Sequence, residues 1–221
     1  MGWLRAALAL AWALSGGLMS GGATAGPVDD LVLAAELNNG REVTTLLVRG
    51  VDPNAVDARG RKALEVALRE DSGRALDSLL DHPASDVNAA NATGETPLML
   101  AAIKGRLDWV QKLVRRGARI HKEGWTPLHY ACSGPDNGVA LWLLGQGAEL
   151  EARSPNGSTP LMMAARYGAM DLAEALLAAG ADATLRNDQG LSALEFAKAA
   201  GRNKLAKQLL QIQQSRLSKA P

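Results

Sequence analysis

The sequence is 221 residues long, with a formal net charge of +1 and one cysteine. At about 100–200 residues per domain, this length fits one compact unit or two small ones. The low charge argues against a broad nucleic-acid surface, and one cysteine excludes an internal disulfide framework or a multi-cysteine metal site. Aromatic residues make up only 4%, so small and medium aliphatic side chains must fill the core, which suits closely packed helices.

Residues 1–25 differ from the rest of the chain. They carry one charge, Arg5, then the apolar run 6–14 and a small-residue stretch that ends in Ala23-Thr24-Ala25. A basic start, an apolar segment of about 7–15 residues and a small-x-small end are typical of a secretory signal peptide. The alternative is an uncleaved membrane anchor, for which the run falls short of the roughly 20 residues that a bilayer needs. We predict a signal peptide at 1–25, with no stable membrane insertion after its cleavage.

Export places the mature chain beyond a membrane, in an oxidising or extracellular space. If the source is bacterial, the predicted destination is the periplasm, and otherwise the chain is secreted.

A short signature recurs through the remaining chain. Its clearest copies begin at Thr96, Thr126 and Thr159, each followed by Pro-Leu, and weaker copies begin at Lys62 and Ser192. The five starts are separated by 34, 30, 33 and 33 residues, and a degenerate copy runs from position 30. Self-similarity at such a period predicts a stack of similar structural units.

Each copy can be read in physical terms. Thr or Ser can cap the free N–H groups of a helix, and proline at the first helical position loses no hydrogen bond. After a polar loop, Val110, Leu113 and Val114 form the apolar stripe of a second helix. Glycines stand where these second helices end and a left-handed residue is needed. They are Gly50, Gly117, Gly147 and Gly180.

A helix, an antiparallel helix and a protruding hairpin, repeated with the pattern T-P-L-H-x-A, resemble the ankyrin repeat over about residues 28–212. The resemblance predicts an all-α ankyrin-repeat solenoid of about six helix-turn-helix units with projecting β-hairpin loops. The expected domain covers 26–214, and 215–221 is expected to be a flexible tail. The units are expected at about 28–59 (a cap), 60–93, 94–123, 124–156, 157–189 and 190–214 (a cap).

Three segments depart from the repeat. The junction 117–126 is three residues shorter than its equivalents, which predicts a truncated hairpin. Gly134, Pro135 and Gly138 predict a longer or looser loop within the fourth unit. Pro83 stands where other units have the closing glycine. Neutral drift in loops and a shaped binding surface both explain these departures, and the sequence leaves both open.

No residue pattern indicates chemistry. His129 occupies the fourth position of its signature and can pair with Thr126, as Ser192 and Glu195 do in a capping box. The same position holds Glu65, Met99, Met162 and Glu195 in the other units. We therefore interpret His129 as structural, and no two histidines have the spacing of helical zinc ligands.

The sulfur-containing side chains could either fill the core or act in redox chemistry or metal binding. Cys132 takes the place of a paired alanine, which predicts a buried, inert thiol rather than a redox or intermolecular-disulfide role. Met99, Met162 and Met163 could bind copper, but their helical spacing favours core filling. No catalytic, cofactor-binding or metal-binding residue is therefore predicted, and no cofactor.

The resemblance implies a protein-binding surface on the concave side of the stack, made by the first helices and the hairpin tips. The family's variable contact positions map onto Arg59, Arg61, Glu95, Lys104, Lys122, Glu123, Trp125, Asn156, Ser158, Arg166, Tyr167, Asp188 and Gln189. Trp125 is the strongest candidate anchor, because neighbouring units carry Glu or Ser there and aromatic residues often dominate interface energy. The alternative is that Trp125 folds back over its own hairpin. Trp109 and Trp142 are expected to be wedges between units.

The resulting hypothesis is a monomeric, non-enzymatic module that binds a protein partner through the concave groove after export. Two narrower roles follow by analogy: an immunity-type inhibitor of a secreted toxic enzyme, and a support factor for a periplasmic oxidative-stress enzyme. An enzyme is disfavoured because the repeats leave no room for a separate catalytic domain. Nucleic acid is not an expected partner.

Overall fold

The computed structural model describes residues 26–169 and 171–217, with side chains described as far as residue 215. The predicted signal peptide lies outside these residues. Twelve helices in the described part form six antiparallel pairs. The first helices of the pairs are α2 (Pro27–Glu36), α4 (Ala63–Arg69), α6 (Pro97–Ile103), α8 (Pro127–Ala131), α10 (Pro160–Tyr167) and α12 (Ala193–Ala199). The second helices are α3 (Gly40–Val48), α5 (Gly73–Asp81), α7 (Leu107–Arg115), α9 (Gly138–Gly145), α11 (Leu172–Ala178) and α13 (Asn203–Leu217).

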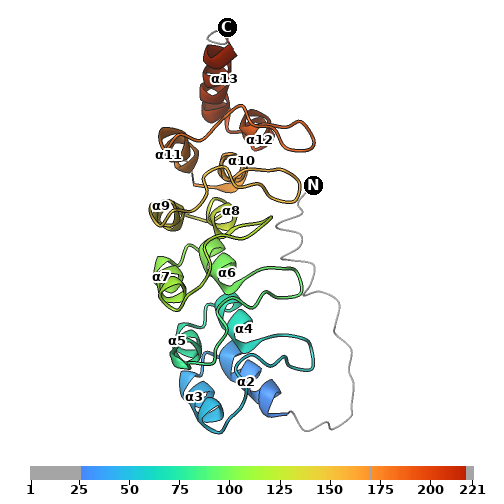
Figure 1. Ribbon diagram of the computed structural model, residues 1–221, viewed down its shortest axis with the longest axis vertical. Coiled ribbons are helices and arrows are strands. Elements are labelled where there is room, and N and C mark those ends of the chain that lie inside the picture. Colours follow the sequence, from blue (N-terminus) through green and yellow to red (C-terminus); the bar gives the residue numbers. More distant parts are fainter. Residues whose placement is uncertain (1–25, 170, 218–221) are drawn as a thin grey trace.

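The pairs stack into a solenoid (Figure 1). The first helices follow one another along its middle, the second helices lie along one side, and the connecting loops project from the other side. We call these loops fingers 1 to 5: residues 49–62, 82–96, 116–126, 146–159 and 179–192. The predicted all-α architecture of stacked units is confirmed.

The fingers are turns rather than extended ladders. Within the described residues, strand pairing is limited to one isolated antiparallel bridge between Val56 and Lys62 in finger 1. The projecting hairpins of the prediction are therefore present as loops, held by short backbone turns and by side-chain hydrogen bonds.

Three first helices begin at a threonine whose hydroxyl accepts a hydrogen bond from the backbone N–H three residues later. The pairs are Thr96 with Met99, Thr126 with His129 and Thr159 with Met162, each at 3.4 Å. In α12 the carboxylate of Glu195 accepts from the N–H and the hydroxyl of Ser192, at 2.8 and 2.5 Å. These contacts satisfy N–H groups that a helix start leaves free.

His129 is part of such a cap. Its Nε2 lies 2.9 Å from the carbonyl oxygen of Ser158, and its Nδ1 lies 2.9 Å from the hydroxyl of Thr126. A carbonyl can only accept, so Nε2 carries the proton and Nδ1 accepts. Burial lowers the pKa of His129 to about 4, and the ring links unit 4 to unit 5 as a neutral group. The predicted structural role is confirmed.

The second helices end in two ways. Gly50, Gly117, Gly147 and Gly180 have φ between 87° and 100°, the left-handed conformation predicted for them. Helix α5 lacks such a glycine and runs into Pro83. There the hydroxyl of Ser85 donates to the carbonyl of Leu79 at 2.5 Å, and the guanidinium of Arg116 donates to the carbonyl of His82 at 3.0 Å. Side chains thus satisfy the carbonyls that a glycine cap would satisfy elsewhere.

The core runs along the whole stack because each unit covers an apolar slot of the next. Val66, Leu100, Tyr130 and Met163 occupy equivalent positions in the first helices of units 2 to 5, and each is at most 7% exposed. Leu33 holds this position in the first described unit and is 50% exposed. Phe196 holds it in the sixth unit and is only partly buried, so the neighbouring units on both sides bury this slot.

Large side chains fill the space between units. Trp109 is 2% exposed. Its ring lies 3.7 Å from the point that a Cβ on Gly73 of the preceding unit would occupy, as expected of a wedge between units. Trp142 is only partly buried. The methionines Met99, Met162 and Met163 are at most 3% exposed, which confirms core filling. Cys132 is fully buried, and burial raises the pKa of its thiol.

One detail differs in extent from the sequence-based expectation, and another agrees with it. Helix α13 continues to Leu217, past residue 214, where the domain was expected to end, and into the segment assigned to the flexible tail. Helix α8 has five residues, and the loop 132–137 that follows it is longer than the corresponding loops of the other units, as predicted. A Cβ added to Gly134 would lie 3.1–3.3 Å from three backbone carbonyl oxygens, so a larger residue here would crowd the neighbouring backbone.

Replacing His129 by Met tests its neutral, buried state. The ordinary pKa is 6.5 and the folded value is about 4, so between these values the unfolded chain binds a proton that the folded chain does not. The wild-type free energy of unfolding should therefore fall by up to about 3 kcal/mol from this group as the pH drops through that window. His129→Met places at this position the residue found at Met99 and Met162. In urea titrations its free energy of unfolding should lack this pH-dependent decrease.

The matched control is His121→Gln, at an exposed position. The assignment is contradicted if His129→Met keeps the wild-type pH dependence between pH 6.5 and 4.

Candidate protein-binding face

The surface between the first helices and the fingers, here called the inner face, collects most of the predicted contact residues. Those with exposed side chains are Arg59, Lys104, Lys122, Glu123, Asn156, Asp188 and Gln189. Those with half-buried side chains are Arg61, Glu95, Trp125, Arg166 and Tyr167. The inner face therefore carries both accessible charges and side chains fixed by neighbours.

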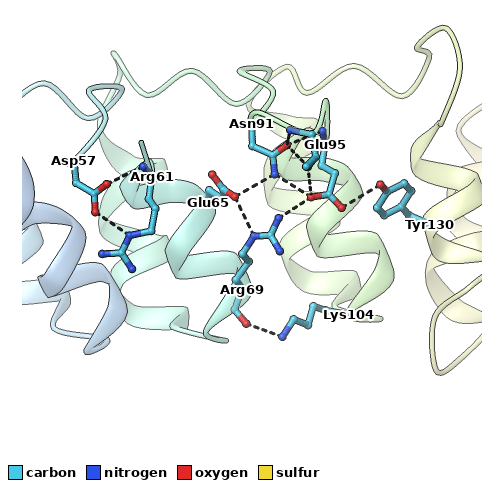
Figure 2. Close-up of polar contacts among 9 residues, drawn as sticks. Asp57, Arg61, Glu65, Arg69, Asn91, Glu95, Lys104 and Tyr130 are labelled. Carbon is cyan, nitrogen blue, oxygen red and sulfur yellow. Dashed lines mark hydrogen bonds and ion pairs between the residues drawn. The ribbon is translucent and has the colours of Figure 1, made fainter. Parts of the chain in front are cut away.

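Glu95, at the end of finger 2, is the centre of a polar network that we call the Glu95 cluster (Figure 2). Its carboxylate accepts hydrogen bonds from the guanidinium of Arg69 at 2.6 Å, the amide of Asn91 at 2.9 Å and the hydroxyl of Thr93 at 3.0 Å. The other carboxylate oxygen accepts from the hydroxyl of Tyr130 at 3.1 Å. Both oxygens thus accept hydrogen bonds from within the protein.

Arg69 connects the cluster to its neighbours. Its Nε donates to Glu65 at 3.0 Å, one helical turn earlier in α4, while its Nη2 reaches Glu95 in the next unit. Its backbone carbonyl accepts from Nζ of Lys104 at 2.7 Å. With Tyr130 in α8, the cluster spans units 2, 3 and 4 and fixes side chains that come from different repeats (Figure 2).

The surroundings stabilise the charged form of Glu95. Burial alone would raise the pKa of this carboxyl group, but the hydrogen bond from Asn91, the positive charge of Arg69 and the bonds from Thr93 and Tyr130 together lower it. Burial and the negative charge of Glu95 raise the pKa of Tyr130. Around neutral pH the cluster therefore holds an ionised carboxylate and a neutral phenol.

A second network orders finger 1. The Nε of Arg61 donates to Asp57 at 2.8 Å, and its Nη1 donates to Glu36 of α2 at 3.1 Å. Asp57 also accepts from the backbone N–H groups of Arg59 and Arg61, which closes the turn of the finger. Arg61 therefore joins unit 1 to finger 1 and is less available to a partner than the exposed Arg59.

Two aromatic contacts lie further along the inner face. The ring of Trp125 meets the ring of His129 edge-on, with centroids 5.3 Å apart and an interplanar angle of 82°. Part of the Trp125 side chain packs against the core, and part remains exposed. The guanidinium of Arg166 lies 5.3 Å from the centroid of the Tyr167 ring. Trp125 thus packs against its own unit and still presents part of its surface.

Ser158 is a correction to the predicted contact set. It is 1% exposed, its N–H donates to the hydroxyl of Ser154 at 2.9 Å and its carbonyl accepts from His129. It holds finger 4 against unit 4 and does not offer its side chain at the surface. Its place before a Thr-Pro start resembles that of Trp125, but a small side chain there is enclosed by its own finger.

Four residues of this network were not predicted from the sequence as part of the inner face: Arg69, Glu65, Asn91 and Tyr130. Arg69 stands in the same repeat position as Arg166, which the prediction did include, so alignment of the repeats could have found it. The polar role of Tyr130 has no such marker, because its position is a core slot in the other units.

Sequence comparison assigns the family. Models of ankyrin repeats match residues 31–123 and 76–154, and a further ankyrin-repeat model matches 144–197. Together these matches cover most of the chain. The chain belongs to the ankyrin-repeat family. Ankyrin repeats are protein-binding modules, and the described face agrees with such a role.

Relatives of known identity share the repeats over part of their length. The chain is 34% identical over 113 residues to ankyrin repeat and SAM domain-containing protein 6 of Rattus norvegicus, a match that covers 49% of this chain and 13% of that protein. It is 32% identical over 137 residues to the B-cell lymphoma 3 protein homolog of Mus musculus, covering 59% and 31%. This chain therefore corresponds to a small part of these larger proteins.

A solved structure is similar over nearly its full length. It is a chain from the complex of a predatory endopeptidase of Bdellovibrio bacteriovorus with an immunity protein. The TM-score is 0.70 with 28% sequence identity, and the match covers 82% of this chain and 97% of that chain.

No helix within 26–169 or 171–217 is both long and apolar enough to span a membrane. In the same residues, no group of three or more His, Cys, Asp or Glu side chains is placed to hold a metal ion.

Replacing Glu95 by Gln tests the Glu95 cluster. The change removes the charge that pairs with Arg69 and turns one acceptor oxygen into a donor group, on the side of either Asn91 or Tyr130. The free energy of unfolding should fall by about 1–3 kcal/mol, the range for losing charged hydrogen bonds in a half-buried site. Urea denaturation at neutral pH measures it.

The matched control is Glu123→Gln at an exposed position, where a change within about 0.5 kcal/mol is expected. Equal effects of the two substitutions would show that the Glu95 contacts do not stabilise the stack.

Proposed function

We propose that this chain acts after export as a non-enzymatic protein-binding module whose partner docks on the inner face. The observation that carries the proposal is the fixing of inner-face side chains across units by the Glu95 cluster and the Arg61 contacts. A partner that meets such a surface orders few new side chains on binding, so less conformational entropy opposes association. The predicted signal peptide supports the place of action.

Accessible charges around the fixed clusters supply specificity. Lys122 and Glu123 are exposed and directly precede the half-buried Trp125 in the chain, and Lys104 is exposed at the end of α6 in the neighbouring unit. A central aromatic side chain surrounded by polar groups is the usual arrangement of an energetically dominant contact. We therefore place the centre of the partner footprint on units 3 and 4.

An immunity-type inhibitor of a secreted enzyme is the more specific candidate. The observation that favours it is the match over nearly the full length to a chain from a complex of an immunity protein with an endopeptidase. An inhibitor of this kind needs no catalytic group of its own, because a rigid surface that covers the active site of its partner is sufficient. In this version of the proposal, the partner is a secreted hydrolase.

The proposal predicts a defined mature chain. Mass spectrometry of the exported protein should find Gly26 as the first residue. Exported protein that begins at Met1 would contradict cleavage of the predicted signal peptide.

Two substitutions on the inner face, a charge reversal and an aromatic truncation, test the docking surface. Immobilised wild-type chain should capture a protein from the exported fraction, and Lys122→Glu and Trp125→Ala should each weaken that capture by about tenfold or more, because hot-spot losses are about 2 kcal/mol. Arg115→Glu, an exposed control on α7 outside the inner face, should capture as the wild type does.

A second measurement on the captured protein separates the two versions of the proposal. An immunity-type inhibitor should abolish the hydrolytic activity of its partner at equal concentration. A captured partner that keeps full activity would contradict the inhibitor role, while the broader proposal of a protein-binding module would still stand. Capture unaffected by both inner-face variants would contradict the docking surface itself.

A further inference from the structure

The base of each finger carries one residue at an equivalent position, and these five residues form a row along the stack that we call the base row. The preceding finger fixes the place of this residue in fingers 2 and 3. The backbone N–H of Asp86 donates to the side chain of Asn54 at 2.8 Å, and the N–H of Arg119 donates to that of Asn88 at 2.8 Å. From finger 1 to finger 5, the base row consists of Asp52, Asp86, Arg119, Glu149 and Asp182.

Arg119 is the one cation in the base row. Asp52 and Asp86 close the turns of their own fingers, because each carboxylate accepts from the backbone N–H two residues later, at 2.9 and 2.8 Å. A guanidinium group has no acceptor and cannot replace this contact. The side chain of Arg119 is exposed, and within the described residues it forms no ion pair. Its positive charge therefore serves neither the turn of its own finger nor a neighbouring unit.

The shortening of finger 3 brings a second exposed cation close to Arg119. Lys122 stands two residues before Gly124, the turn glycine of this finger, and forms no ion pair in the part of the chain that the structure describes. Lys122 follows the base row by three positions, whereas its equivalents in the other fingers follow it by six. Three residues of chain span at most about 11 Å, so one face of a partner can contact both cations. The equivalents of Lys122 are Ala58, Ala92, Pro155 and Asp188.

Other cations of the same unit hold the stack together. Unit 3 (94–123) contains seven basic and three acidic residues, and the units on either side have an excess of acidic residues. Arg106 and Lys112 form ion pairs with Asp71 and Asp77 of unit 2. The two cations of finger 3 make no such pair, so cohesion between units does not account for them.

The acidic neighbours of finger 3 restrict the kind of ligand. Asp86 and Glu149 flank Arg119 in the base row, and the exposed Glu123 follows Lys122. A nucleic acid carries phosphate along its whole length and binds through many phosphate contacts, so it would also meet these carboxylates. A small group of carboxylates on a folded protein avoids them. Opposite charges that meet across an interface select a partner and fix its orientation.

We propose that finger 3 binds a small acidic patch on the protein partner and thereby fixes which repeat the partner meets. Because the repeats are similar, apolar contacts alone would let a partner dock one unit away. In that displaced position the acidic patch would face Asp86 or Glu149, and like charges disfavour it. This inference rests on the proposed docking of a partner on the inner face and adds the charge of the partner and the unit at which it docks.

Moving the positive charge by one finger tests the inference. The double variant Arg119→Glu with Glu149→Arg keeps the composition and the net charge of the chain, and both positions are exposed. The matched control, Asp81→Lys with Lys207→Asp, exchanges charges at exposed positions on α5 and α13. Circular dichroism and urea denaturation establish that both variants are folded.

The first probe is the exported fraction, passed over each immobilised chain. The protein that the wild type retains should be retained equally by the control and about tenfold more weakly or worse by the double variant, because the cation then stands one finger away from the acidic patch. Raising sodium chloride from about 0.05 M to about 0.5 M should weaken retention by the wild type more than retention by the double variant, since salt screens the contact that the variant lacks.

A single-stranded oligothymidine of about 20 nucleotides is the second probe, because it distinguishes a nucleic acid from an acidic protein. The wild type should not bind it. Binding by the wild type that the double variant loses would overturn the assignment of finger 3 to a protein.

Retention of the captured protein by the double variant at wild-type strength, or the same salt dependence in both chains, would also overturn the inference. If Trp125→Ala still weakens capture in that case, the proposed docking on the inner face stands and only the role of the charge pattern fails. A wild-type chain that retains no protein would overturn both.

Discussion

The structure depends on the burial of one apolar slot per unit by the neighbouring units. A single pair of short helices cannot cover its own apolar side chains, so stability accumulates only through stacking. The contrast between Leu33, which is half exposed in the first described unit, and its buried equivalent Leu100 shows this dependence directly. Small side chains such as the paired alanines let the helices approach closely and keep the stack thin.

Stacking also explains why residues of the inner face can differ from unit to unit without loss of the fold. The apolar slots and the helix caps use a fixed set of positions, so polar side chains between the first helices and the fingers can differ from unit to unit. Arg69 and Glu95 come from different units and meet only because the stack holds α4 and finger 2 side by side. The same logic allows finger 3 to be short, because His129 and Trp109 keep its unit attached to its neighbours.

Local chemistry was the part of the fold that the sequence predicted well. Threonine before proline marked helix starts, glycine marked helix ends, and the Thr126–His129 contact followed from a spacing of three residues. Contacts between units were beyond such rules, since nothing in a single sequence pairs Glu95 with Tyr130. Ser158 was misplaced because exposure at its position depends on side-chain size, and Ser85 was missed as the group that ends α5 because a tertiary contact replaces the expected glycine there.

Native-state hydrogen exchange on a Leu209→Ala variant tests the claim of a linear stack most directly. Leu209 is fully buried in α13, and its truncation should cost about 2–5 kcal/mol. In a stack coupled only between neighbours, amide protection should fall most in α12 and α13, less in α10, and not at all in α2 and α4. An equal loss of protection in all helices would contradict the account and indicate a single globular core.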